Sequence, residues 1–287
     1  MFYLVDKPTG ISSFSAVARV RRITKSAKAG HTGTLDPLAS GLLIVATNGS
    51  TKLIPYFEND RKTYRFTVDF SRSSESLDLG TETWDVDAPD LENARKSMGN
   101  GGLEALLSKF RGKILQAPPK YSALRINGRR AYHLARKGKD FEIPERETEV
   151  FSLEIESFVF PFATFTAEVS AGTYVRSLAR DIGSEFDTGA VVTELRRTAI
   201  GRLSVERAHP PLEAGTENAI DPAEILPDMV VLRPSDEIVK NLVAGISQPS
   251  PVRIDAGKNV LVRNEEDYVS LCVSQNSMLI PLRNAIG

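Results

Sequence analysis

The sequence predicts an α+β protein with a large N-terminal domain and a small β-rich module near its C-terminal end. Runs that alternate apolar and polar residues, as strands do, are interspersed with runs whose apolar residues recur every three or four positions, as in helices. A Pro- and acid-rich stretch separates them from several short strand-like runs. A chain of 287 residues has room for one large domain and a small one.

The elements of the large domain follow from these periodicities. Strands are predicted at residues 2–5, 42–46, 64–70, 150–155 and 163–169. Ser12 or Ser13 can cap a helix that carries Val17, Val20 and Ile23 on one side. Further helices are predicted at 103–110, at 174–182 after a Gly-Thr turn, and at 191–197. The polar segment 71–90 has no clear pattern.

The C-terminal part is predicted to begin with a linker at residues 210–227, where prolines and acids concentrate. Ser235 can cap a short helix that ends at Gly245. Short strands are then predicted at 252–255, 260–263, 268–273 and 278–282, which suggests a small β-barrel-like module.

Composition excludes several classes of protein. With 41% hydrophobic and 25% charged residues, the chain resembles soluble globular proteins, and no apolar run approaches the ~20 residues that span a bilayer. One cysteine fits a reducing compartment. Three scattered histidines argue against a Cys/His metal site, and the sequence contains no phosphate-binding glycine motif. An enzyme of this composition is expected to use neither cofactor nor metal.

Charge is distributed unevenly along the chain. Residues 211–287 hold 11 acids and 6 bases, whereas residues 109–139 hold ten bases and no acid. Tyrosines and a histidine lie among these bases, a mixture that suits a phosphate backbone with unstacked bases. A second basic group, residues 19–28, leads toward residue 30. A charge run is usually a solvated helix face, but ten bases without an acid favour nucleic acid as the partner.

The most informative segment is GHTGTLDPLASG at residues 30–41, with three glycines, a proline and the carboxylate of Asp36. Glycine permits backbone conformations that are closed to other residues. The loop precedes a predicted buried strand, so the fold would hold Asp36 rigidly, as a nucleophile or general base is held. An Asp that caps its own turn is the alternative reading, and spacing alone leaves both open.

Six ordered motifs together resemble the TruB-type pseudouridine synthases, and most closely the stand-alone bacterial enzymes that act on tRNA. The motifs are DKPTGISS at 6–13, GHTGTLDPLASG at 30–41, KTY at 62–64, PPKYSA followed by NGRRAY at 118–132, GTYVRSLARD at 172–181 and LRRTAIG at 195–201. The family usually has a Thr- and Asp-rich stretch after the tyrosine strand, which residues 71–80 only approximate. We expect this difference to affect loop structure rather than chemistry.

The resemblance implies a catalytic domain built on a mixed, mostly antiparallel sheet flanked by helices, at residues 1–227. An RNA-gripping insertion at about 109–150 and a PUA-like RNA-binding module at 228–287 would complete the chain. It also implies conversion of uridine to pseudouridine at position 55, in the T loop of tRNA, by flipping the base out of the loop and without a cofactor.

The resemblance also assigns roles to residues. Asp36 would be the catalytic carboxylate, with Arg176 paired to it and Tyr64 stacked on the base. Leu195 would pack near the base, and His31 would fill the space that the base leaves. Substrate contacts are further expected from Lys7, which would brace the loop or bind phosphate, and from Arg129 and Arg130. No metal ligands are expected.

The expected partner is the T stem-loop of tRNA, with no membrane and no obligatory protein partner, for a monomer in the cytoplasm. Two alternatives remain at this stage. One is the related catalytic subunit that works with guide RNA and protein partners. The other is an RNA-binding protein that assists tRNA folding without catalysis. The acidity of residues 211–287 puts RNA contact by the C-terminal module in doubt.

Overall fold

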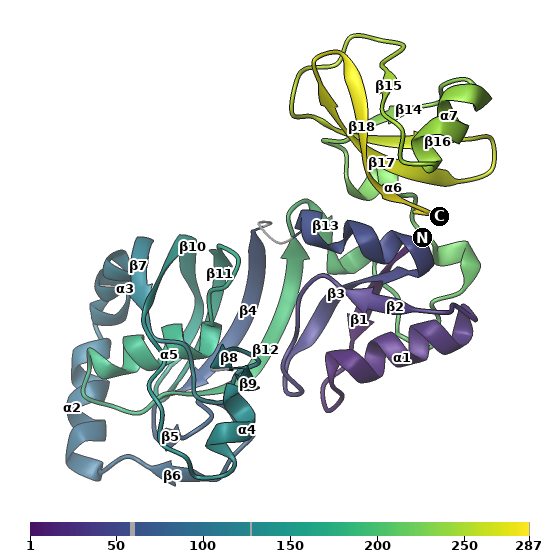
Figure 1. The fold of residues 1–287 in the computed structure, drawn as a ribbon. Helices are drawn as coiled ribbons and strands as arrows, with labels where there is room; N and C mark the ends of the chain where they lie inside the picture. The colour runs from purple at the N-terminus through teal and green to yellow at the C-terminus, as the bar shows by residue number, and fades with distance from the viewer. Residues whose placement is uncertain (58–60, 127, 287) are drawn as a thin grey trace.

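The computed structural model describes residues 1–57, 61–126 and 128–286. A nine-stranded sheet forms the centre of the large N-terminal part, in the order β1-β3-β12-β4-β11-β10-β7, with β2 beside β3 and β13 beside β12 (Figure 1). Its strands are β1 (Phe2–Lys7), β2 (Ala29–His31), β3 (Ser40–Thr47), β4 (Lys62–Asp69), β7 (Gly112–Gln116), β10 (Arg146–Val159), β11 (Phe162–Val169), β12 (Val191–Ile200) and β13 (Leu203–Ser204). Among these described strands, β12 and β3 form the one parallel pair. The mixed, mostly antiparallel sheet is therefore confirmed.

Helices and short hairpins surround this sheet. The helices are α1 (Ser13–Ile23), α2 (Ala88–Met98), α3 (Gly102–Leu107), α4 (Ala131–Ala135), α5 (Val175–Ser184) and α6 (Pro222–Ile225), with short 3-10 turns η1 (Asn48–Phe57), η2 (Ser108–Phe110), η3 (Val205–Arg207) and η4 (Thr216–Asn218). Two hairpins lie outside it: β5 (Arg72–Ser74) with β6 (Thr83–Asp85), and β8 (Arg125–Ile126) with β9 (Arg129–Arg130). Every helix in the described ranges is too short or too polar to span a bilayer.

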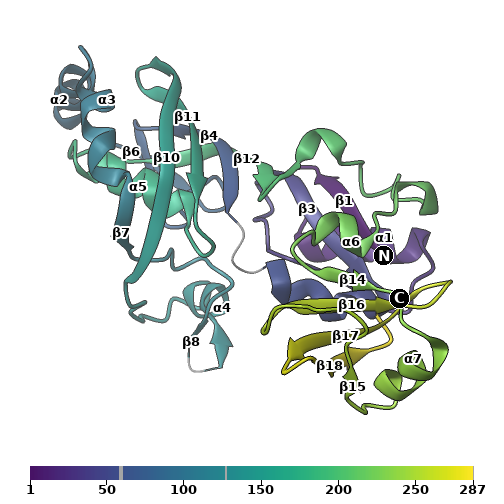
Figure 2. The same cartoon turned by 90° about the horizontal axis from the view of Figure 1, so that it is seen from above.

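Each half of the sheet packs against a helix through its own apolar cluster. On one half, Leu178 and Ile182 of α5 pack against Phe66 of β4 and Phe165 of β11, whose rings stack. On the other half, Val17 and Val20 of α1 pack against β1 and β3. Seen from above, the two halves lie side by side, with β12 and β4 between them (Figure 2).

The prediction of a helix at 191–197 is wrong, because these residues belong to β12. Val191 and Val192 are β-branched, which favours a strand. The strand is bonded to β4 along its length and to β3 at Arg196 and Arg197. Pairing with strands on both sides satisfies the backbone N–H and C=O groups of this segment. In isolation the segment could satisfy them with its own backbone only within a helix, so the neighbouring strands decide its structure.

The C-terminal module is a five-stranded sheet in the order β14-β16-β17-β18-β15, together with helix α7 (Asp236–Val243). Its strands are β14 (Val230–Leu232), β15 (Gln248–Pro249), β16 (Asn259–Arg263), β17 (Tyr268–Gln275) and β18 (Met278–Asn284). The strand predicted at 252–255 is absent from these described residues, and β14 and β15 were not foreseen. Both are short edge strands, whose few residues show no alternation.

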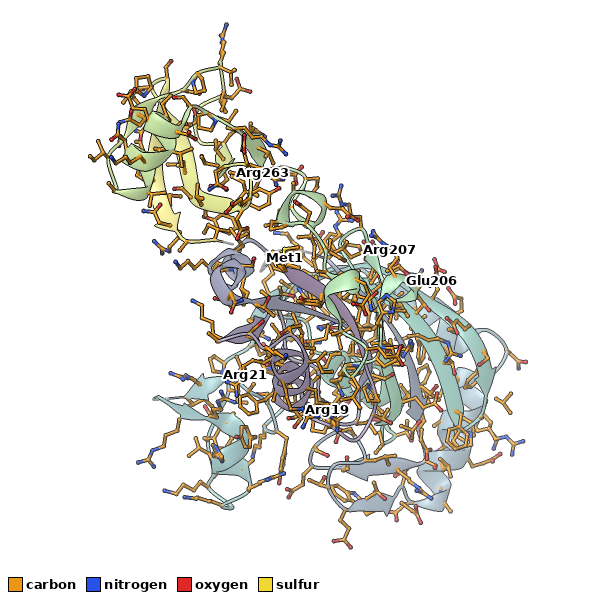
Figure 3. The ribbon with its side chains drawn as sticks, turned by 90° about the vertical axis from the view of Figure 1, so that its right-hand side faces the viewer. Met1, Arg19, Arg21, Glu206, Arg207 and Arg263 are labelled. Atoms are coloured by element: carbon orange, nitrogen blue, oxygen red, sulfur yellow. The ribbon has the colours of Figure 1, made fainter. Side chains whose placement is uncertain are left out.

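The segment 210–227 is not the free linker that its composition predicts. Ile220 exchanges backbone hydrogen bonds with Phe2, and Leu226 is buried. One apolar cluster joins Leu53 of η1 to Leu271 and Ile286 of the module. Met1 and Arg263 lie at this junction (Figure 3), where Arg263 faces Asp221 at 3.8 Å. The module is thus fixed to the nine-stranded part of the protein by packed side chains.

The acidic residues counted in 211–287 do not all belong to the C-terminal module. Four of these acids lie in 211–227, the segment packed on the nine-stranded sheet, and residues 228–287 hold seven acids and six bases. The module itself is therefore nearly neutral, and its charge does not oppose contact with RNA.

Candidate active site

The loop that carries Asp36 is held from several sides. Ser13 Oγ donates to the carbonyl of Leu35 at 2.9 Å and accepts from the amide of Leu35 at 2.8 Å. The amide of Gly10 donates to the carbonyl of Pro37 at 2.8 Å. These bonds tie residues on both sides of Asp36 to the start of the chain, so the carboxylate has a defined position.

Arg197 of β12 also fixes the position of the Asp36 loop. It is 1% exposed, and its Nε donates to Leu42 O at 2.7 Å while its Nη2 donates to Gly33 O at 3.2 Å. Gly41 has φ +101°, and a Cβ there would lie 2.2 Å from Arg197 O. Only glycine permits both this conformation and this close approach.

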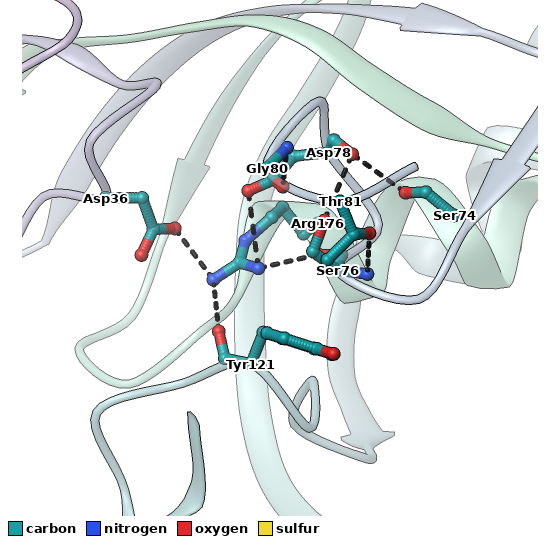
Figure 4. Close-up of polar contacts among 8 residues, drawn as sticks. All are labelled: Asp36, Ser74, Ser76, Asp78, Gly80, Thr81, Tyr121 and Arg176. Atoms are coloured by element: carbon teal, nitrogen blue, oxygen red, sulfur yellow. Dashed lines mark hydrogen bonds and ion pairs between the residues drawn. The ribbon is translucent and has the colours of Figure 1, made fainter. Parts of the chain in front are cut away.

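Arg176 lies in the first turn of α5, directly after the turn in which Gly172 has φ +88°. Its side chain is 3% exposed, and Nη2 lies 2.8 Å from Asp36 Oδ2. The guanidinium also donates to two backbone carbonyls, Ser76 O at 2.6 Å and Tyr121 O at 2.9 Å (Figure 4). The expected pair of Asp36 and Arg176 is therefore present, and both terminal nitrogens of the planar guanidinium have partners.

Asp78 is a second carboxylate at this guanidinium, and the sequence did not single it out. It is buried, and its Oδ2 lies 3.4 Å from Arg176 Nη1. Ser74 and Ser76 donate to its backbone carbonyl, and the amide of Gly80 donates to its Oδ1. This loop therefore contributes charge to the site, whereas the expectation that its departure from the family pattern affects loop structure rather than chemistry stays a prediction. An Asp between two leucines and before a glycine was the available signal.

The electrostatics of Asp36 combine opposing effects. Burial raises the pKa of its carboxyl group, the nearby Arg176 lowers that pKa in part, and Asp78 raises it again. The ammonium of Lys7 is a weaker stabilising charge. Because the side chain keeps 32% of its surface exposed, the carboxylate can be reached by a ligand.

Two pockets meet at Asp36 and Arg176. The first, of about 380 Å³, also has Tyr64, Leu195 and Lys62 in its wall. A carboxylate therefore faces a space bounded by an aromatic ring and an aliphatic side chain. The second, of about 620 Å³, lies toward α1 and the insertion; its wall includes Phe14, His31, Ser122, Arg130, Tyr132 and Arg136.

The structure thus places Asp36, Tyr64, Arg176 and Leu195 at one pocket, and His31 at the adjoining one. Burial lowers the pKa of His31, and its Nδ1 has no hydrogen-bond partner among the described residues. Lys7 is buried: its Nζ donates to Pro8 O and Ile11 O, both at 2.9 Å, and burial lowers its pKa to about 8. This position suits bracing of the loop rather than phosphate contact.

Arg129 and Arg130 are exposed on β9, in the insertion. Nine of the ten bases of residues 109–139 fall into two groups, and the tenth, Arg136, lies in the wall of the second pocket. Lys109, Arg111, Lys113 and Lys120 face acidic partners. The second group lines a third pocket, of about 540 Å³, whose wall is formed by Arg125, Gly128, Arg129, Arg130, His133, Leu134, Lys137 and Lys139. The cationic surface at this pocket therefore includes only five of the ten bases that the sequence suggested for nucleic-acid binding. Asn127 of the NGRRAY motif lies outside the described residues.

Comparison with solved structures identifies the fold. The fold is similar to that of a box H/ACA ribonucleoprotein bound to a substrate RNA containing 2′-deoxyuridine, with TM-score 0.65 and 21% identity over 99% of this chain and 84% of that chain. It is also similar to the structure of a Cbf5-Nop10-Gar1 complex, with TM-score 0.66 and 23% identity over the same shares. The chain therefore has the fold that these two structures share.

Comparison with other sequences identifies the family to which the chain belongs. Residues 21–175 match the model described as "TruB family pseudouridylate synthase (N terminal domain)". A tRNA pseudouridine synthase B of Aquifex aeolicus is 42% identical over 93% of this chain and 89% of its own length. One from a Caulobacter species is 35% identical over 97% and 94%. The chain belongs to the TruB family of pseudouridylate synthases.

Proposed function

We propose that this protein converts uridine to pseudouridine in tRNA, at position 55 of the T loop. The observation that carries the proposal is the pair of Asp36 and the buried Arg176, which opens onto a pocket walled by Tyr64 and Leu195. Relatives that share 35–42% of its residues over most of their length are tRNA pseudouridine synthases.

The chemistry needs few groups because the product is an isomer of the reactant. The bond between C1′ of the ribose and N1 of uracil breaks, and its electron pair passes to the ring. The ring turns, a bond forms between C5 and C1′, the proton on C5 leaves, and N1 takes up a proton. Atoms and electrons balance without an added cofactor.

The residues of the first pocket suit these steps. The carboxylate of Asp36 supplies a nucleophile, or a negative charge beside the sugar while the bond is broken. Arg176 favours the ionised form of Asp36, against the effect of burial. Tyr64 and Leu195 bound the space in which the detached ring is retained, and the tyrosine lies within the same pocket wall to assist loss of the C5 proton.

Access to a uridine inside a folded loop requires base flipping, which costs a few kcal/mol. In this proposal His31 occupies the space that the base leaves. Arg129 and Arg130 bind phosphates of the loop. Lys7 braces the Asp36 loop through the carbonyls of Pro8 and Ile11.

We assign catalysis to residues 1–227, RNA gripping to the insertion at about 109–150, and further RNA contact to a PUA-like module at 228–287. The protein works as a monomer in the cytoplasm, without a protein partner. These assignments are supported by the two sheets, by the basic surface of the insertion and by the near neutrality of the module.

The decisive experiment incubates purified protein alone with an unmodified tRNA transcript and maps pseudouridine by mass spectrometry. We expect modification at position 55 with the wild type and none with Asp36→Asn, which retains tRNA binding within a few-fold. Turnover of Asp36→Asn near that of the wild type would remove Asp36 from the chemistry.

The same experiment separates the alternatives. Activity that appears only after guide RNA and protein partners are added would identify the guide-dependent subunit, whose fold is similar. Binding of tRNA without any modification would favour a protein that assists tRNA folding.

A further inference from the structure

A closed ring of contacts surrounds the guanidinium of Arg176. Its Nη1 donates to Ser76 O and its Nη2 donates to Tyr121 O. Outside the guanidinium, the hydroxyl of Tyr121 donates to Oε2 of Glu75 at 3.0 Å. Glu75 directly precedes Ser76, so this side-chain bond links the two segments whose carbonyls hold Arg176.

Tyr121 is also the point at which the insertion joins the site. The amide of Tyr132 donates to Ser122 O at 3.1 Å, and the amide of Ala131 donates to Leu124 O at 2.8 Å. Helix α4 is therefore bonded to the residues that follow Tyr121. Arg136, just beyond this helix, lies close enough to act on the charge of the Tyr121 hydroxyl.

We propose, on the basis of the function proposed above, that the hydrogen bond between Glu75 and Tyr121 is a positioning contact that couples the insertion to the Asp36–Arg176 pair. The coupling uses a single nitrogen. Arg176 Nη2 serves both Tyr121 O, at 2.9 Å, and Asp36 Oδ2, at 2.8 Å. Displacement of Tyr121 therefore changes the direction in which the guanidinium meets the carboxylate.

The bond between Glu75 and Tyr121 is exposed, and exposed polar contacts add little to stability. Its effect is to fix the distance between the two carbonyl oxygens, Ser76 O and Tyr121 O. When RNA draws the insertion onto the site, the contact holds this separation, and Arg176 presents its donors to Asp36 in one geometry. Misplacement of a reacting group by about 1 Å costs up to a hundredfold in rate.

The test compares Tyr121→Phe, Glu75→Ala and Glu75→Gln in single-turnover assays on a T stem-loop transcript, with the dissociation constant measured separately. Tyr121→Phe and Glu75→Ala should each lower the rate at saturating RNA about three- to tenfold, with binding within twofold and melting temperature unchanged. Glu75→Gln keeps an oxygen acceptor and should restore most of the rate. Combining Tyr121→Phe with Glu75→Ala should cost no more than either change alone.

A pH profile separates positioning from a structural role. The charged groups that face Asp36 are Arg176, Asp78 and Lys7. A weaker contact with Arg176 leaves the pKa of Asp36 higher, so the acid limb of the rate should move to higher pH in Tyr121→Phe and Glu75→Ala. Glu92→Ala, which breaks an exposed pair with Lys96 on α2, outside the insertion and both pockets, is the matched control and should change neither rate nor profile.

Two results would overturn the inference. One is a change in binding alone, with the saturating rate and the acid limb unchanged, which would make Tyr121 an RNA contact. The other is wild-type behaviour of Tyr121→Phe and Glu75→Ala in every assay. Wild-type protein that makes no pseudouridine in the same assay would refute the proposed function instead.

Discussion

Replacing Arg176 with lysine tests whether the planar fork, rather than positive charge alone, organises the site. The wild-type guanidinium pairs with Asp36 and donates to the carbonyls of Ser76 and Tyr121. A lysine ammonium is a compact charge on a flexible stem and cannot reproduce this planar geometry. We expect Asp36 or the two carbonyls to lose their partner.

The size of the effect follows from these contacts. Hydrogen bonds to charged groups contribute about 1.5–3 kcal/mol each. Loss of two such bonds that persist in the transition state corresponds to at least about 3 kcal/mol, or roughly a hundredfold in rate. Single-turnover formation of pseudouridine at saturating tRNA measures this directly, and a thermal melt shows whether the variant is folded. A folded Arg176→Lys variant within threefold of the wild-type rate would refute the reasoning.

Three further predictions concern charge. Asp78→Asn removes a negative charge that raises the pKa of Asp36, so the acid limb of the pH–rate profile should move to lower pH; a shift to higher pH would show that Asp78 acts mainly by holding Arg176. Changing Arg129, Arg130 and Arg136 together to glutamine should weaken tRNA binding and flatten its salt dependence, and an unchanged slope in a salt titration would place the RNA elsewhere. Burial lowers the pKa of Lys7 from 10.5 to about 8, so the folded protein binds fewer protons than the unfolded chain between these values and its stability should rise with pH there; denaturant melts of Lys7→Met should lack this rise.

Local sequence accounts for much of the fold. The helix α1 and the strands β1, β3, β4, β10 and β11 follow from their apolar patterns, because each buries one face or both in one of the apolar clusters. Periodicity failed at β12, where hydrogen bonds from two neighbouring strands decide the structure. It also failed at β14 and β15, which are too short to show a pattern.

The site was predictable only where a motif carries it. Asp36 and Arg176 were expected to meet and lie 2.8 Å apart. Spacing alone gives no such contact, because 140 residues separate the two positions. Asp78 and Arg197 were missed for a physical reason: both are buried charges in the walls of the two pockets, and nothing in a linear sequence distinguishes a buried charge from an exposed one.

The parallel pairing of β12 with β3 has a consequence for folding kinetics. It joins residues 40 and 196, and the same region brings together Lys7, Asp36, Asp78 and Arg176. Contacts of such high sequence separation form slowly, because chain entropy is lost before they contribute. During refolding, therefore, catalytic activity should return later than the helical signal and together with burial of β12, which would make turnover a reporter of the completed sheet.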